Sequence, residues 1–198
     1  MTRSSGARAR EEGFSVVELV VSTALLGLVI GFIGMIAARG QGAHDASQQS
    51  LRLAARTSRA LDRVVAELAF LGGDLVNPDP TAVNGVQVLN FRQATGVAGG
   101  VVTWGSAARL GFEYAAGEID NGLDDDGNGL ADEGLLVLTF DVGGAGERRV
   151  VLCNGVAEGG FNLQRTGEVM NVRLTAQEAG PGGRILVRTL QTAFRLRN

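Results

Sequence analysis

The chain has very little cysteine, histidine and lysine: one cysteine, one histidine and no lysine among 198 residues. Because Cys153 is the only cysteine, no disulfide can form within the chain. His44 alone cannot form a histidine cluster around a metal, and the sequence has neither a nucleophile elbow nor a phosphate-binding loop. All eighteen basic residues are arginines and the net charge is −3, which does not indicate binding to nucleic acid. We therefore expect a protein that is not an enzyme and that does not bind nucleic acid.

What the sequence does have is a long apolar run near its N-terminus. From Leu19 to Ala38 there are twenty residues without a charge. A helix of this length rises about 1.5 Å per residue and reaches roughly 30 Å, which is the thickness of the hydrocarbon core of a bilayer. One acid, Glu18, lies at the start of the run. An ionised acid in such a segment costs on the order of 2.5–3.5 kcal/mol at the helix centre, so its presence indicates a partner.

The charges on either side of the run predict its orientation. Arg3, Arg8 and Arg10 precede it, whereas the first basic residue after it is Arg39. By the positive-inside rule the N-terminus is cytoplasmic and the rest of the chain is exported. The run is longer than the apolar core of about 7–15 residues in a cleaved secretory signal. An uncleaved signal anchor is therefore the plain alternative.

A short motif at the start of the run is more specific. Residues 13–21 read Gly-Phe-Ser-Val-Val-Glu-Leu-Val-Val, which closely resembles the N-terminal motif of type IV prepilins and type II secretion pseudopilins. The resemblance implies that prepilin peptidase removes the basic leader 1–13 by cutting after Gly13, and that Phe14 becomes an N-methylated N-terminus. It also implies that Glu18 aligns an incoming subunit with the growing filament. The new amine of a neighbouring subunit would attract this carboxylate by roughly 4 kcal/mol at about 4 Å and an effective dielectric near 20.

The resemblance also implies where the protein resides and what it contacts. Residues 14–38 would be a single-pass inner-membrane helix that later enters the core of a pilus or pseudopilus, in the periplasm or at the cell surface. The expected partners are prepilin peptidase and other pilin or pseudopilin subunits. Gly27 and Gly31 form a Gly-x-x-x-Gly pair, which permits close helix packing but also weakens the helix, and both roles stay open.

A second helical pattern follows the membrane run. Gly40 and Gly42 are expected to interrupt the helix, and within residues 39–73 an amphipathic helix is predicted from about Ser47 to Leu71. Its apolar stripe consists of Ala54, Leu61, Val64, Val65, Leu68 and Leu71. Arginines occupy the other faces, which is typical of a solvated surface.

The remaining region, 74–198, is rich in short β patterns separated by glycines. The expected strands are 86–91, 101–104, 109–114, 135–141, 148–152, 169–176 and 184–194. A long helix followed by antiparallel strands predicts an α+β fold. The family resemblance implies the same plan in its pilin-like form, with the N-terminal helix packed on an antiparallel β-sheet.

Looser patterns in 56–68 and 190–198 look like minor pilins of the PilW type and like the GspJ-like pseudopilins. They favour a minor structural subunit of a type IV pilus, with a GspJ-like minor pseudopilin of type II secretion as the alternative. A hypothesis of another class is a membrane-anchored, calcium-dependent adhesin or binding module.

The calcium hypothesis comes from an acidic loop at 118–134. Its spacing resembles the Asp-x-Asp-x-Asn-Gly loops of calcium-binding repeats, in which alternating oxygen ligands surround a hard cation and a glycine makes the sharp turn. Leu135 stands where an EF-hand has its bidentate glutamate, so another acid must complete the shell, Glu133 or Asp120. The predicted ligands of a structural calcium ion are Asp124, Asp126, Asn128, Leu130 through its carbonyl, Asp132 and Glu133.

Overall fold

The apolar N-terminal run is helical in the computed structural model, which describes residues 15–71, 76–81 and 83–196, without the side chains of 38–41, 43 and 181. The helix α1 covers Val16–Leu68, 53 residues. Ser15 caps its N-terminus, because the Ser15 hydroxyl accepts the N–H of Val17 at 3.2 Å. The chain forms two compact units, Met1–Asp45 and Ala46–Asn198, and α1 contributes to both.

The expectation that Gly40 and Gly42 interrupt the helix is wrong, because α1 continues through both of them. A glycine in a helix interior costs up to about 1 kcal/mol, and the nearby alanines, which have the highest helix propensity, oppose a break. The helix ends at Leu68 rather than at the predicted Leu71. Leu71 instead pairs with Gln93 in an isolated β-bridge, so the chain leaves the helix to join the sheet.

Within the second unit, one face of α1 packs against the sheet. The buried residues of this face are Leu53, Thr57, Ala60, Leu61, Val64 and Leu68. The predicted stripe is thus confirmed for Leu61, Val64 and Leu68, whereas Ala54 and Val65 are only half-buried. Thr57 is fully buried and donates its hydroxyl to the Leu53 carbonyl at 2.7 Å, so no polar group is left without a partner there.

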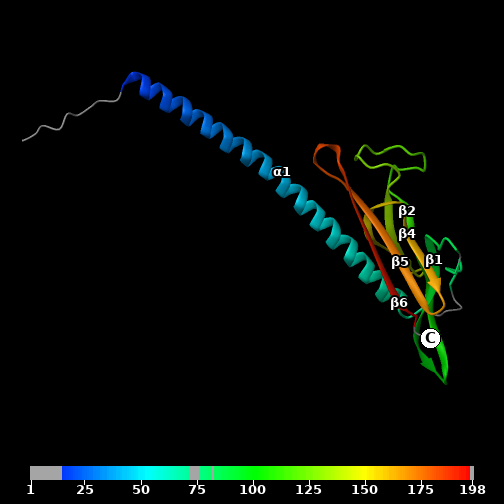
Figure 1. Cartoon of the computed structure of the whole chain (residues 1–198). Helices are drawn as coiled ribbons and strands as arrows, with labels where there is room; N and C mark the ends of the chain where they lie inside the picture. The colour runs from blue at the N-terminus through cyan, green and yellow to red at the C-terminus, as the bar shows by residue number, and fades with distance from the viewer. Residues whose placement is uncertain (1–14, 72–75, 82, 197–198) are drawn as a thin grey trace, which may run out of the picture. The chain divides into compact units, whose positions relative to one another are not determined.

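Six strands form one antiparallel sheet in the order β1-β2-β3-β4-β5-β6 (Figure 1). Their bounds are β1 Val88–Ala98, β2 Val101–Tyr114, β3 Gly134–Phe140, β4 Arg148–Thr166, β5 Val169–Ala179 and β6 Ile185–Arg195. With α1 packed on one face, the layout is α+β, as predicted. The two strands expected at 101–104 and 109–114 are one strand, because β2 passes through Gly105 at a register shift and pairs with β1 on both sides of it.

The strand β4 is the element that the sequence pattern most underestimated, since it extends fourteen residues beyond the expected end at 152. Its first half, up to Val156, pairs with β3, and its second half, from Phe161, pairs with β5 and no longer with β3. Gly159, with a φ angle of +62°, lies in the change of register between Val156 and Phe161, and Gly155, with a φ angle of +61°, lies in the change of register between β3 and β4 just before it. Beyond this irregularity, Val86 pairs with Leu163 and takes the place of β3 beside β4.

Side chains of the sheet alternate between the core under α1 and the opposite face. The core contains the buried face of α1 together with Leu89, Phe91, Leu110, Leu136, Leu138, Phe161, Leu163, Met170, Val172 and Leu174. The strands β4 and β5 place polar residues on the opposite face. Residues 115–133 connect the end of β2 to the start of β3. This connection carries the acidic loop.

Candidate functional site

The predicted processing site, Gly13 and Phe14, lies outside the described residues. Glu18 lies in the first turn of α1, where the positive end of the helix dipole favours a carboxylate. Ser15 and Glu18 have the Ser-x-x-Glu spacing of a capping box.

The segment Val16–Ala37 of α1 is long and apolar enough to cross a membrane. Its large apolar side chains are exposed; Leu19 and Ile30, for example, have relative exposures of 59% and 60%. Gly27 and Gly31 have no atom within 4 Å of the position that a Cβ would occupy. Contacts within the described chain therefore give no reason for glycine at these two positions.

The side chain of Glu118 is buried in the acidic loop and bonds to the backbone of the loop. Its side chain is only 5% exposed and accepts three backbone N–H groups, from Asp125 at 3.0 Å, from Asp126 at 2.9 Å and from Asp132 at 3.1 Å. These bonds give the backbone N–H groups of the loop the hydrogen-bond partners that a helix or strand would otherwise provide. Glu118 was not among the predicted ligands, although it opens the acidic stretch.

Two of the predicted ligands also shape the loop through backbone bonds. Asp124 accepts the N–H groups of Gly127 at 2.8 Å and Asn128 at 3.0 Å with one oxygen, and that of Gly129 at 2.8 Å with the other. Asp132 accepts the backbone N–H groups of two residues on the opposite side of the loop, at 3.0 and 2.7 Å. Both carboxylates therefore hold the fold of the loop.

Three other carboxylates converge on one point. Glu118, Asp126 and Glu133 each offer an oxygen, and these oxygens lie within 4.8 Å of one another. Glu133 is 3% exposed; its Oε1 accepts the amide of Asn128, and its Oε2 is buried with no hydrogen-bond partner among the described residues. A buried acceptor without a partner is costly, and a buried carboxylate oxygen even more so. A cation bound at this point would provide the missing partner.

A second acidic group lies nearby and includes a residue from β4. Asp120, Asp132 and Glu158 offer carboxylate oxygens that also lie within 4.8 Å of one another. Desolvation raises the pKa of the adjacent Tyr114 hydroxyl, and the negative charges of Asp120 and Glu158 raise it further. The sequence spacing could not place Glu158 here, because it is far from the loop along the chain.

The six predicted metal ligands are thus distributed over several roles. Asp126 and Glu133 lie in the first acidic group, Asp132 lies in the second, and Asp124 bonds to the backbone. Asn128 donates to Asp126 and Glu133, while its oxygen accepts the N–H of Leu130 at 2.9 Å. Among the described residues there are therefore two groups of acidic side chains that could hold a metal ion.

The first group opens onto a hollow of about 410 Å³ between the acidic loop, β4, β5 and α1. Asp126, Asn128 and Glu133 line its acidic side, and Arg56 of α1 lines another side. Arg56 forms an ion pair with Glu178 at 3.4 Å. A hydrated cation in this hollow would have direct access to the carboxylates.

Comparisons of the chain with protein-family models, with curated proteins and with solved structures gave no match.

Proposed function

We propose that this chain is a minor pilin-like structural subunit of a type IV pilus, which prepilin peptidase processes after Gly13 and which assembles through its N-terminal helix. The observation that carries the proposal is the motif from Gly13 to Glu18, followed directly by an uncharged run of membrane length. In this proposal the helix resides in the inner membrane, with its N-terminus in the cytoplasm, before it enters the filament.

Two features of the described residues support this proposal. The segment Val16–Ala37 exposes apolar side chains over its whole length, as expected of a helix that packs first against lipid and later against other helices. The unexplained glycines, Gly27 and Gly31, suit close contact with neighbouring subunits better than any contact within the chain. The α+β layout of the second unit agrees with a helix that presents a globular domain.

Processing is tested by the intact mass of the protein from membranes of cells with and without a prepilin peptidase. We expect the peptidase to remove residues 1–13 and to leave a methylated Phe14 at the N-terminus. Gly13→Ala should block cleavage, whereas Gly6→Ala, a matched change within the leader, should not. A wild-type chain that keeps its leader in the presence of an active peptidase would contradict the proposal.

Assembly is tested separately with Glu18→Ala. We expect the variant to be inserted in the membrane and processed, but to be missing from sheared filaments, because the amine of the neighbouring subunit loses its carboxylate partner. Thr23→Ala is the control, since the Thr23 hydroxyl bonds only to carbonyls of its own helix. Recovery of the mature chain with a type II secretion machinery rather than with pili would assign it to the GspJ-like alternative.

For the acidic loop, the proposed cofactor is a structural calcium ion held by Glu118, Asp126 and Glu133. Carboxylate oxygens are the ligands that calcium prefers, and the adjacent hollow leaves room for the water molecules that complete its shell of 6–8 oxygens. The orphaned oxygen of Glu133 favours this group over the second one. We expect an affinity around 10⁻⁴–10⁻³ M, as in extracellular modules, measured by calorimetric titration.

A further inference from the structure

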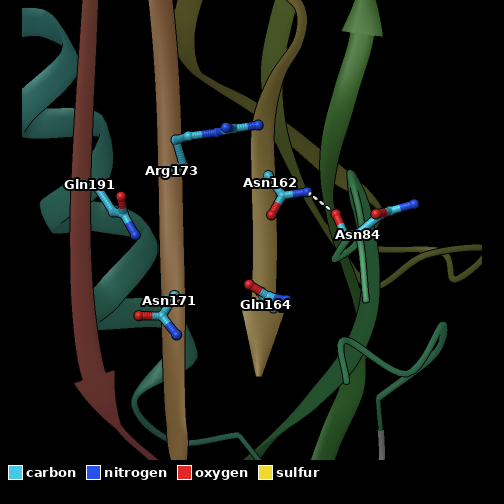
Figure 2. Close-up of a pocket in the computed structure, with 6 residues that line it drawn as sticks. All are labelled: Asn84, Asn162, Gln164, Asn171, Arg173 and Gln191. Carbon is cyan, nitrogen blue, oxygen red and sulfur yellow. Dashed lines mark hydrogen bonds between the residues drawn. The ribbon is translucent and has the colours of Figure 1, made fainter. Parts of the chain in front are cut away.

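A grid of carboxamides lies on the face of the sheet opposite the core. Across β4, β5 and β6, Asn162 pairs with Arg173 and Arg173 with Gln191; in the next outward-facing row, Gln164 pairs with Asn171. Paired residues lie on strands about 4.8 Å apart, and successive rows are about 7 Å apart. Together with the loop residue Asn84, they line a hollow of about 220 Å³ (Figure 2). We call this set the amide face: Asn84, Asn162, Gln164, Asn171, Arg173 and Gln191.

One wall of the amide face is held firmly in place. The segment before β1 is bound to β4 by reciprocal backbone bonds of 2.8 Å between Val86 and Leu163. The Asn162 amide donates to the Asn84 carbonyl at 2.7 Å (Figure 2), and the Gln164 amide donates to the Val83 carbonyl at 3.0 Å. Gly85 permits this close approach: its φ is +68°, and a Cβ there would lie 2.5 Å from the Asn162 Oδ1. Two of the amides are therefore oriented before any ligand arrives.

Charge distinguishes the amide face from the rest of the surface. Its lining has five carboxamides, one guanidinium and no carboxylate. Arg173 is exposed and makes no ion pair or hydrogen bond with its side chain among the described residues. Arg149 and Arg195, by contrast, are paired with glutamates. Figure 2 shows Arg173 extending from β5 toward β4, on the side of Asn162.

This lining matches a particular ligand chemistry. A carboxamide both donates and accepts hydrogen bonds, as a sugar hydroxyl does, and the fork of an arginine binds a carboxylate with two parallel bonds. Single-stranded nucleic acid would need aromatic side chains for stacking, and the amide face has none. The hollow is below the roughly 300–1,000 Å³ of pockets for larger ligands, so it suits about one sugar unit while the rest of a chain lies along the sheet.

We propose that the amide face binds an acidic polysaccharide through one uronate unit, with its carboxylate on Arg173 and its hydroxyl groups on the carboxamides of β4, β5 and β6. This site lies outside the acidic loop and is independent of processing at Gly13. It would give the exported domain a ligand at a surface that the helix does not cover.

The test is a calorimetric titration of the full chain in detergent with oligogalacturonate, in the presence of a chelator. The chelator prevents calcium from bridging the ligand to the acidic loop. We expect saturable binding that is lost with the methyl ester of the same oligosaccharide. Arg173→Gln should weaken binding about 10- to 100-fold, because it removes a charge-assisted pair of hydrogen bonds. Arg188→Gln, another exposed arginine without a glutamate partner in the described chain, is the matched control.

Folding is checked by the thermal unfolding midpoint, which Arg173→Gln should leave unchanged because this side chain makes no bond within the described chain. Asn171→Ala is a second variant that should weaken binding without removing charge. Absence of binding by the wild-type chain, equal binding of the methyl ester, or equal binding by Arg173→Gln would each overturn the proposal. A single-stranded oligonucleotide that bound through Arg173 while the uronate did not would also overturn it.

Discussion

Replacing Glu133 by glutamine should stabilise the protein in chelator, and calcium should remove most of this advantage because it stabilises the wild type far more than the variant. The oxygens of Glu118 and Glu133 lie within 4.8 Å of each other, and both side chains are buried. At that distance and an effective dielectric near 20, two like charges repel by about 3 kcal/mol. In Glu133→Gln this repulsion is absent, and the new amide can donate to the neighbouring carboxylates. In chelator we therefore expect the variant to be about 1–3 kcal/mol more stable than the wild type.

Calcium should remove most of this difference. With a dissociation constant around 10⁻⁴–10⁻³ M, 10 mM calcium stabilises the wild type by about 1.4–2.7 kcal/mol. Glu133→Gln loses a charged ligand and should keep little of this gain. The assay is thermal unfolding of the full chain in detergent, followed by far-ultraviolet circular dichroism, in chelator and in 10 mM calcium.

The matched control is Asp125→Asn, which removes one charge from the same loop but lies outside both acidic groups. It should keep the full calcium shift. A full calcium shift in Glu133→Gln would refute the assignment of the ion to this residue. Loss of the shift in Glu158→Gln, but not in Glu133→Gln, would move the ion to the second acidic group.

Three further predictions concern packing, backbone and protonation. Leu53→Ala should lower the free energy of unfolding by about 2–5 kcal/mol because Leu53 is buried, whereas Leu51→Ala, at 69% exposure on the same helix, should cost about 0.5 kcal/mol or less in denaturant titrations. Gly155→Ala should destabilise the protein more than Gly159→Ala. Both residues have φ near +60°, and an alanine in this conformation costs about 1–2 kcal/mol. Only at Gly155 would the new Cβ also meet a carbonyl oxygen, at 2.4 Å. Burial raises the pKa of the Cys153 thiol. The protonated thiol therefore makes its full contribution to stability below the ordinary thiol pKa, and this contribution is lost as pH rises through the raised pKa. Iodoacetamide labelling of Cys153 should be slow in the folded chain at pH 8.5 and fast after unfolding.

The helix and the general plan of the sheet could be predicted because their signals are local. The spacing of Leu61, Val64 and Leu68 repeats within one helix and needs no knowledge of the partner surface. The interruption predicted at Gly40 and Gly42 was wrong because low helix propensity is a weak signal, which a long helical context overrides.

The extent of β4 could not be predicted, since the part beyond residue 152 contains Gly155 and Gly159 and lacks a continuous apolar alternation until Phe161. Those glycines lie inside the strand at two register shifts and have positive φ angles, and from the sequence alone they indicate a turn. Pairing with β5, a long-range contact, decides the outcome.

The acidic loop shows the same limit at the level of single side chains. The spacing identified the loop and included Asp126 and Glu133, which the structure brings together with Glu118. It could not tell which carboxylates bond to backbone N–H groups, as Asp124 does, because that depends on the path of the loop in three dimensions. Glu158 reaches the loop from β4 only after the sheet has formed.

The order of the strands has a consequence for how the second unit folds. Each strand of the sheet pairs with its neighbours in the chain, so every hairpin except β2–β3, which is connected by residues 115–133, closes over a short loop and costs little chain entropy. Sheets of this kind have a low contact order and are expected to fold faster than sheets that pair distant segments. A chain that emerges progressively could therefore add hairpins one after another, whereas the docking of α1 onto the core and the pairing of Val86 with Leu163 would bring together residues far apart in sequence.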